Sequence, residues 1–97
     1  MEKRYFVYIV RCKDNTLYTG FTTDVPKRLH AHNAGKGAKY TRSRLPVTVV
    51  WREAQPNKGA ALRREAAIKR LRREEKLALI HGTVPLDITQ ESEAQIL

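Results

Sequence analysis

The chain has 97 residues, 41% of them hydrophobic, which allows one domain with a modest core and excludes a deep substrate cavity. All 19 Lys and Arg but only seven of the ten acidic residues lie within 1–82, giving that segment a net charge of +12, so we expect a nucleic-acid partner rather than a surface charged only for solubility. A single cysteine excludes an internal disulfide, and the apolar run "YFVYIV" is too short to span a membrane, so we expect a soluble cytoplasmic protein.

The first predicted element is a β-hairpin. Aromatic and β-branched residues fill 4–11 and 16–21, and the polar "KDNT" lies between them. Tyr8 and Tyr18 share a face only if the loop has an odd number of residues or a bulge shifts the register; a loop at 13–15 would place Tyr18 opposite Val10 and diagonal to Tyr8. Alternatively, both are ordinary strand tyrosines with their hydroxyls at the rim of the core.

The stretch "TTDVPKRLHAHNAG" predicts a helix of about ten residues, because it has a cap candidate at 23 or 24, a proline in the first turn and Gly35 at its end. Arg28 and His32 lie four residues apart and therefore on one face of this helix. An arginine beside a histidine suits a phosphate and a proton transfer near neutral pH, although a solvated basic face is the alternative. His30 and His32 diverge on a helix, which argues against a zinc site.

Residues 35–45, "GKGAKYTRSRL", have no periodicity and predict a basic loop. Its cationic side chains can contact phosphates, its tyrosine can stack on a base, and its glycines allow a nucleic-acid strand to approach closely. The alternative is a disordered basic loop without a partner. We predict nucleic-acid-binding residues Asn33, Lys36, Lys39, Tyr40, Thr41, Arg42 and Arg44.

The remaining pattern predicts a third strand, "PVTVVWRE", and then helical sequence from 58 to 81 that can form one helix or two and ends at Gly82. Residues 83–97 carry three acidic residues and no basic ones, and we expect a flexible acidic tail after a domain at 1–82. The order ββαβα predicts a small three-stranded mixed α/β domain.

Glu65 lies inside the apolar arc of the last helical segment when the sequence is projected at 100° per residue. A carboxylate in that position is costly unless a positive charge meets it, such as Arg28 or a divalent cation. A single carboxylate with water and phosphate as the other ligands is a usual way to hold magnesium. The alternative is an i,i+4 ion pair with Lys69 at the helix edge.

Taken in order, these motifs resemble the GIY-YIG nuclease superfamily, and most closely its small single-domain bacterial branch. "VYI" at 7–9 and "YTG" at 18–20 stand where the two signature tripeptides would be, "KRLHAHN" matches the helix with the arginine and histidine, and "LRREAAIKRL" matches the helix with the metal-binding glutamate. The resemblance covers about residues 4–81. It implies a small, mostly antiparallel three-stranded α+β sheet flanked by helices.

The resemblance also implies a role for each candidate catalytic residue. Tyr8 and Tyr18 would border the scissile phosphate and orient or deprotonate the attacking water. Arg28 would stabilise charge on the phosphate, and His32 would assist proton transfer. Glu65 would be the one protein ligand of a Mg²⁺ or Mn²⁺ ion. We expect the metal and the arginine to favour the ionised form of a tyrosine.

The implied activity is metal-dependent endonuclease cleavage of DNA, preferred over RNA, with low sequence specificity and a place in DNA repair or nucleic-acid processing. We expect a monomer, which leaves room for a targeting partner. Val7 and Thr19 replace a glycine and an isoleucine of the signature, and no asparagine follows Asn57, which predicts slow turnover. The alternative is a nucleic-acid-binding module on the same fold without catalysis.

Overall fold

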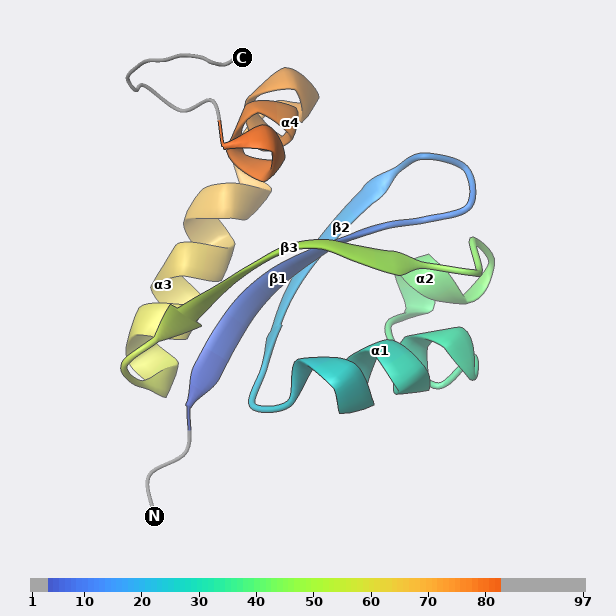
Figure 1. Cartoon of the computed structure of the whole chain (residues 1–97), viewed down its shortest axis with the longest axis horizontal. Helices are drawn as coiled ribbons and strands as arrows, with labels where there is room; N and C mark the ends of the chain where they lie inside the picture. Colours follow the sequence, from blue (N-terminus) through green and yellow to red (C-terminus); the bar gives the residue numbers. More distant parts are fainter. Residues whose placement is uncertain (1–3, 83–97) are drawn as a thin grey trace.

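The computed structural model describes residues 4–82, which form a three-stranded sheet with helices (Figure 1). Its elements are β1 (Tyr5–Arg11), β2 (Leu17–Thr22), α1 (Val25–Asn33), α2 (Lys39–Arg42), β3 (Thr48–Gln55), α3 (Lys58–Lys69) and α4 (Arg73–His81). The strand order is β2-β1-β3, and both strand pairs are antiparallel. The predicted α+β class is confirmed, but the segment 35–45 is not all loop because it contains α2. The predicted acidic tail lies outside the described residues.

The hairpin of β1 and β2 has the register that the sequence allowed with a loop at 13–15. Its loop is closed by a hydrogen bond of 2.9 Å from the Cys12 N–H to the Thr16 carbonyl, which leaves three residues between them. The last of these, Asn15, has a φ of 69°, a left-handed conformation that asparagine tolerates well. Tyr18 therefore pairs with Val10, and both tyrosines lie on one face of the sheet.

Strand alternation divides the core into two clusters, one on each face of the sheet. On one face, Val7 and Ile9 of β1 pack against Ile68 of α3, and all three side chains are fully buried. On the other face, Tyr8 and Val10 pack with hydrophobic residues of α1 and of the segment before β3. Figure 1 shows α3 and α1 on opposite sides of the sheet. The candidate catalytic tyrosines thus lie on the α1 face.

The helix ends follow from local side-chain chemistry. Asp24 caps α1 by accepting a hydrogen bond from the Lys27 N–H at 3.0 Å, and Asn57 caps α3 in the same way. Gly35 and Gly82 have φ values of 77° and 70°, the left-handed conformation that ends helices. The predicted long helical segment is two helices, α3 and α4. No helix within 4–82 has the length and apolar character needed to cross a membrane.

Candidate active site

The candidate site begins with a close contact between neighbouring strands. Tyr8 pairs with Gly20 across the hairpin, and its side chain is only 2% exposed. A Cβ atom added to Gly20 would lie 2.6 Å from the Tyr8 hydroxyl oxygen, so the ring of Tyr8 lies directly over the glycine. The absence of a side chain at position 20 therefore gives the Tyr8 ring its place across β2.

The Tyr8 hydroxyl lies beside two side chains of α1. Its oxygen is 2.9 Å from Nε2 of His32, which is fully buried, and it accepts a hydrogen bond of 3.4 Å from Nε of Arg28. The spacing of four residues along α1 brings both side chains to this hydroxyl. The structure thus unites Tyr8, Arg28 and His32 through direct contacts.

Tyr18 joins the same cluster through its ring. The ring meets His32 edge-on, with 5.6 Å between centroids, and stacks on Tyr40 at 5.9 Å. The Tyr8 ring also meets His32 edge-on, at 6.0 Å. Both tyrosines therefore pack on one imidazole, as their shared face requires.

Burial controls the protonation of the cluster. It raises the pKa of Tyr8 above the usual 10.0, and the hydrogen bond and charge of Arg28 offset only part of that rise, while the charges of Tyr18 and Glu65 add to it. Burial, and then the charge of Arg28, lowers the pKa of His32 below 6.5. The expected ionisation of a tyrosine rests on a metal and the arginine together, and the arginine alone does not outweigh the burial of Tyr8. At neutral pH the site holds a protonated tyrosine and a neutral histidine.

Glu65 lies on α3 between Ala61 and Ile68, which face the core. Its side chain is 16% exposed, and its Oε2 atom is 3.5 Å from Nζ of Lys69, the i,i+4 pair that the sequence left open. The structure gives it no ion pair with Arg28, the other partner considered. Its carboxylate is close enough to Tyr8 for its charge to raise the pKa of that hydroxyl.

A divalent cation fits this carboxylate only as a site with one protein ligand. Within 4–82 no three His, Cys, Asp or Glu side chains gather as a metal cluster. The Glu65 carboxylate contacts Lys69 at 3.5 Å, and one carboxylate is sufficient for Mg²⁺ when water and phosphate complete its coordination. The donor set is therefore compatible with the expected ion.

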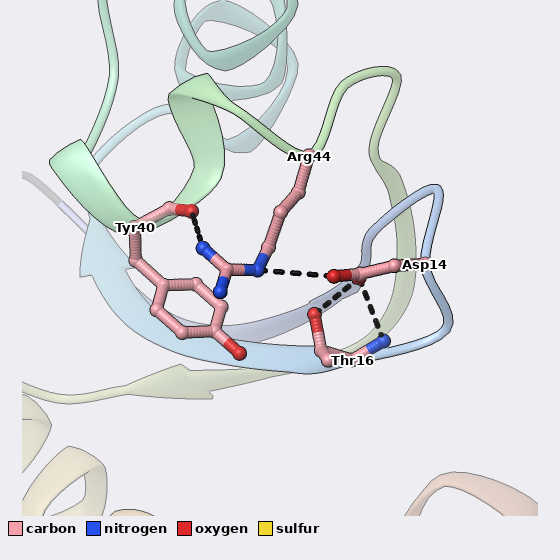
Figure 2. Close-up of polar contacts among 4 residues, drawn as sticks. All are labelled: Asp14, Thr16, Tyr40 and Arg44. Atoms are coloured by element: carbon pink, nitrogen blue, oxygen red, sulfur yellow. Dashed lines mark hydrogen bonds and ion pairs between the residues drawn. The ribbon is translucent and has the colours of Figure 1, made fainter.

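Figure 2 shows the polar contacts that join the basic segment at 35–45 to the turn of the hairpin. Arg44 makes an ion pair of 3.1 Å with Asp14, donates a hydrogen bond of 2.8 Å to the Tyr40 carbonyl, and places its guanidinium 4.0 Å from the centre of the Tyr40 ring. Asp14 in turn accepts hydrogen bonds from the backbone and hydroxyl of Thr16, which hold the pKa of its carboxyl below the usual value. Arg44 thus has a structural role here.

Two more residues of the predicted nucleic-acid interface are committed to the fold. Thr41 has no exposed surface, so it cannot contact nucleic acid in this conformation, which corrects that prediction. The Asn33 amide accepts a hydrogen bond from the Val47 N–H at 2.8 Å and donates one to its carbonyl at 3.1 Å, which joins the end of α1 to the segment before β3. The exposed members of the set whose side chains are not committed in this way are Lys36, Lys39, Tyr40 and Arg42; Asn33 is exposed as well, but its amide is bonded to Val47.

Sequence reasoning did not find two contacts that shape the site. Thr41 Oγ1 lies 2.8 Å from Nδ1 of His32, on the opposite side of the imidazole from Tyr8. A Cβ atom on Gly37 would collide with the same nitrogen, so this glycine makes room for the histidine rather than for a nucleic-acid strand. The "GKG" motif was the available signal, but the partner of its second glycine is decided by the tertiary fold.

Comparisons with known proteins agree with this geometry. Residues 4–78 match the model of the GIY-YIG catalytic domain. A UPF0213 protein of Streptococcus sanguinis is 54% identical over 80 residues, which cover 82% of this chain and 92% of that protein. The solution structure of a UPF0213 protein from Bacillus halodurans is similar, with a TM-score of 0.54 and 44% sequence identity over 86% of this chain and 88% of that one. The solution structure of a protein from E. faecalis has a TM-score of 0.59 and 32% identity over 94% of this chain and 97% of that one. The chain belongs to the GIY-YIG domain family, among the small bacterial UPF0213 proteins.

Proposed function

We propose that this protein is a metal-dependent endonuclease that hydrolyses phosphodiester bonds in DNA. The observation that carries the proposal is the buried hydrogen bond between Tyr8 and neutral His32, with the Arg28 guanidinium at the same hydroxyl. This arrangement can accept a proton from the attacking water and places the positive charge of a guanidinium beside the same hydroxyl. Hydrolysis of a phosphodiester needs both a proton acceptor and stabilisation of negative charge.

In the proposed reaction, the Tyr8 oxygen takes a proton from the attacking water while its own proton moves to Nε2 of His32. The tyrosine therefore stays neutral overall, and its raised pKa is no obstacle because a base stands ready for its proton. Burial keeps His32 neutral and able to accept. Tyr18 packs on the same imidazole and limits its movement.

The proposed charge stabilisation comes from Arg28 and from Glu65. The guanidinium of Arg28 would face the phosphate oxygens as negative charge builds on them. Glu65 would hold a Mg²⁺ or Mn²⁺ ion, which when bound supplies further positive charge at the phosphate. The ion pair with Lys69 is long, at 3.5 Å, and the Lys69 side chain is half exposed, so this lysine can give way to a cation.

The proposed substrate lies along the exposed cations of α2 and the segment before it, Lys36, Lys39 and Arg42. These side chains have no ion pair within residues 4–82 and are therefore free for phosphates. Contacts of this kind read the backbone and not the bases, so we propose low sequence specificity. We place the activity on DNA in the cytoplasm, in repair or nucleic-acid processing, with the protein acting as a monomer that a partner can target.

The experiment is incubation of end-labelled single-stranded, duplex and branched DNA with the protein in Mg²⁺, Mn²⁺ or chelator. We expect cleavage with metal that is lost on chelation and in Tyr8→Phe. Arg64→Gln, which alters an ion pair with Glu53 and a contact with the Trp51 ring, should cleave like the wild type. Binding without cleavage in either metal would favour the alternative, a non-catalytic binding module. The pairing of Glu65 with Lys69 is the observation that supports that alternative.

A further inference from the structure

The hydrogen bonds of Thr41 determine where its single hydroxyl proton lies. Oγ1 is 3.0 Å from the carbonyl oxygen of Ala38, which has no proton and can only accept. The Thr41 hydroxyl therefore donates to Ala38. Its oxygen then has lone pairs left for the second contact, the one of 2.8 Å with Nδ1 of His32. For that contact to be a hydrogen bond, Nδ1 must carry the proton.

The same reasoning extends to the other side of the imidazole. A neutral histidine has one ring proton, so an Nδ1–H leaves Nε2 with a lone pair. The contact of 2.9 Å with Tyr8 is then a hydrogen bond that the tyrosine donates. The Tyr8 oxygen still accepts the hydrogen bond from the Arg28 N–H at 3.4 Å. Each of the four hydrogen bonds from Arg28 through Tyr8 and His32 to Thr41 and Ala38 then has one donor and one acceptor.

We propose that Thr41 is a positioning residue that holds His32 in its Nδ1-protonated tautomer, so that Nε2 faces Tyr8 as a proton acceptor. In water, a neutral histidine side chain favours the opposite tautomer, with the proton on Nε2. That tautomer would donate to Tyr8 and could not receive its proton. The tautomer itself is independent of the proposed nuclease activity; its effect on cleavage rests on that activity.

Backbone hydrogen bonds of the short helix α2 hold the Thr41 hydroxyl beside His32. The Thr41 N–H donates to the Ala38 carbonyl at 3.1 Å, and the Arg44 N–H donates to the Thr41 carbonyl at 2.9 Å. Gly37, just before α2, lets the backbone pass against the imidazole. Arg44 ties the far end of α2 to the hairpin turn through Asp14. The tertiary fold thus fixes both sides of the hydrogen bond between Thr41 and His32.

The test is a two-bond proton–nitrogen correlation spectrum of ¹⁵N-labelled protein at neutral pH, which distinguishes the two tautomers by the shifts of their ring nitrogens. We expect His32 in the wild type to be protonated at Nδ1. In Thr41→Val, which keeps the shape and removes the hydroxyl, we expect the Nε2-protonated form to become the major one. In Thr41→Ser, which restores a hydroxyl, we expect the wild-type tautomer.

Cleavage measured on the same samples tests the catalytic consequence. We expect Thr41→Val to lose at least about tenfold in rate and no more than the roughly 10²–10⁴-fold that acid–base catalysis supplies, and Thr41→Ser to recover it. Thr19→Val is the matched control, because it removes the hydroxyl of a threonine that is 2% exposed and whose Oγ1 has no hydrogen-bond partner among residues 4–82. We expect this control to keep the tautomer and the rate and to melt at a higher temperature.

Several outcomes would overturn the proposal. A wild type protonated at Nε2, or a Thr41→Val protein that keeps the Nδ1 proton, would refute the tautomer assignment. A changed tautomer with an unchanged cleavage rate would refute the positioning role. If Thr41→Val does not fold, a Thr41→Ser protein whose His32 is protonated at Nε2 would refute the proposal instead, because its hydroxyl should restore the wild-type tautomer. A wild type that does not cleave DNA but shows the Nδ1 proton would refute the nuclease function and support the tautomer.

Discussion

Replacing Gly20 by alanine tests how closely the candidate site is packed. The new Cβ atom would lie 2.6 Å from the Tyr8 hydroxyl oxygen and 2.8 Å from Cζ of the ring. Such distances are too short for real contacts, so the tyrosine or the strand must move. The ring is buried and its hydroxyl is bonded to His32, and a shift of the ring therefore breaks that bond.

The expected cost has two parts. Overpacking a buried site costs about 1–3 kcal/mol, and leaving the buried Nε2 of His32 without a partner costs about 1–3 kcal/mol more. We therefore expect Gly20→Ala to lower the free energy of unfolding by about 2–6 kcal/mol. For a domain of this size each kcal/mol corresponds to about 4–8 °C, so Tm should fall by at least about 8 °C. Cleavage should fall further than the folded fraction, since the displaced hydroxyl no longer meets His32.

Thermal unfolding and DNA cleavage, measured on one preparation of each protein, provide the assay. Gly59→Ala is the control, because that glycine lies in the first turn of α3 and its added Cβ would come no closer than 3.3 Å to Arg63 Nη1 and 3.4 Å to the capping Oδ1 of Asn57. We expect it to hold or raise stability by up to about 1 kcal/mol. The double variant Tyr8→Phe with Gly20→Ala removes the closest atom, so its cost should be less than the sum of the two single changes by about 0.5–3 kcal/mol. A Gly20→Ala protein with wild-type Tm and cleavage would refute the packing described for Tyr8.

Three further predictions concern charge. Glu65→Gln should abolish metal-dependent cleavage and leave the protein folded, because it removes a charge that is only 16% exposed and is paired with Lys69 at 3.5 Å. Melting and cleavage assays decide this, and a stable variant that cleaves like the wild type refutes the metal-ligand role. The pKa of His32 is lower in the folded protein than the 6.5 of the unfolded chain, so its contribution to stability is present above pH 6.5 and is lost as the pH falls through the folded pKa. Between pH 7.5 and 5, the free energy of unfolding should therefore fall more steeply in the wild type than in His32→Gln. Equal slopes of this free energy against pH would contradict the prediction. Lys36, Lys39 and Arg42 are the three exposed cations of the proposed binding surface. Replacing them by alanine should lower the slope of the logarithm of the DNA-binding constant against the logarithm of salt concentration by up to about 0.7 per lost contact on single-stranded DNA, and an unchanged slope would place the binding surface elsewhere.

Local patterns in the sequence were sufficient to locate the hairpin and the helix ends. The alternation of side chains made the shared face of Tyr8 and Tyr18 conditional on a loop of odd length, and the structure supplied that loop. Asp24 and Gly35 mark the two ends of α1 because capping and left-handed glycine act within a few residues. The four-residue spacing of Arg28 and His32 placed both on one helix face for a similar reason. These features depend on neighbours along the chain, which a sequence displays directly.

The contacts that complete the site depend on the tertiary structure. Whether Glu65 meets Lys69, Arg28 or a metal could not be decided from helix geometry, since all three agree with its position on α3. Thr41 has a sequence typical of a polar loop, yet packing of α2 against α1 buries it completely on the imidazole. No periodicity predicts that contact, because the chain between the two residues must turn at Gly35 and pass His32 at Gly37. The sequence determined which residues lie on the hairpin and on α1, and only the packing of α1, α2 and the hairpin decided which of their polar atoms meet.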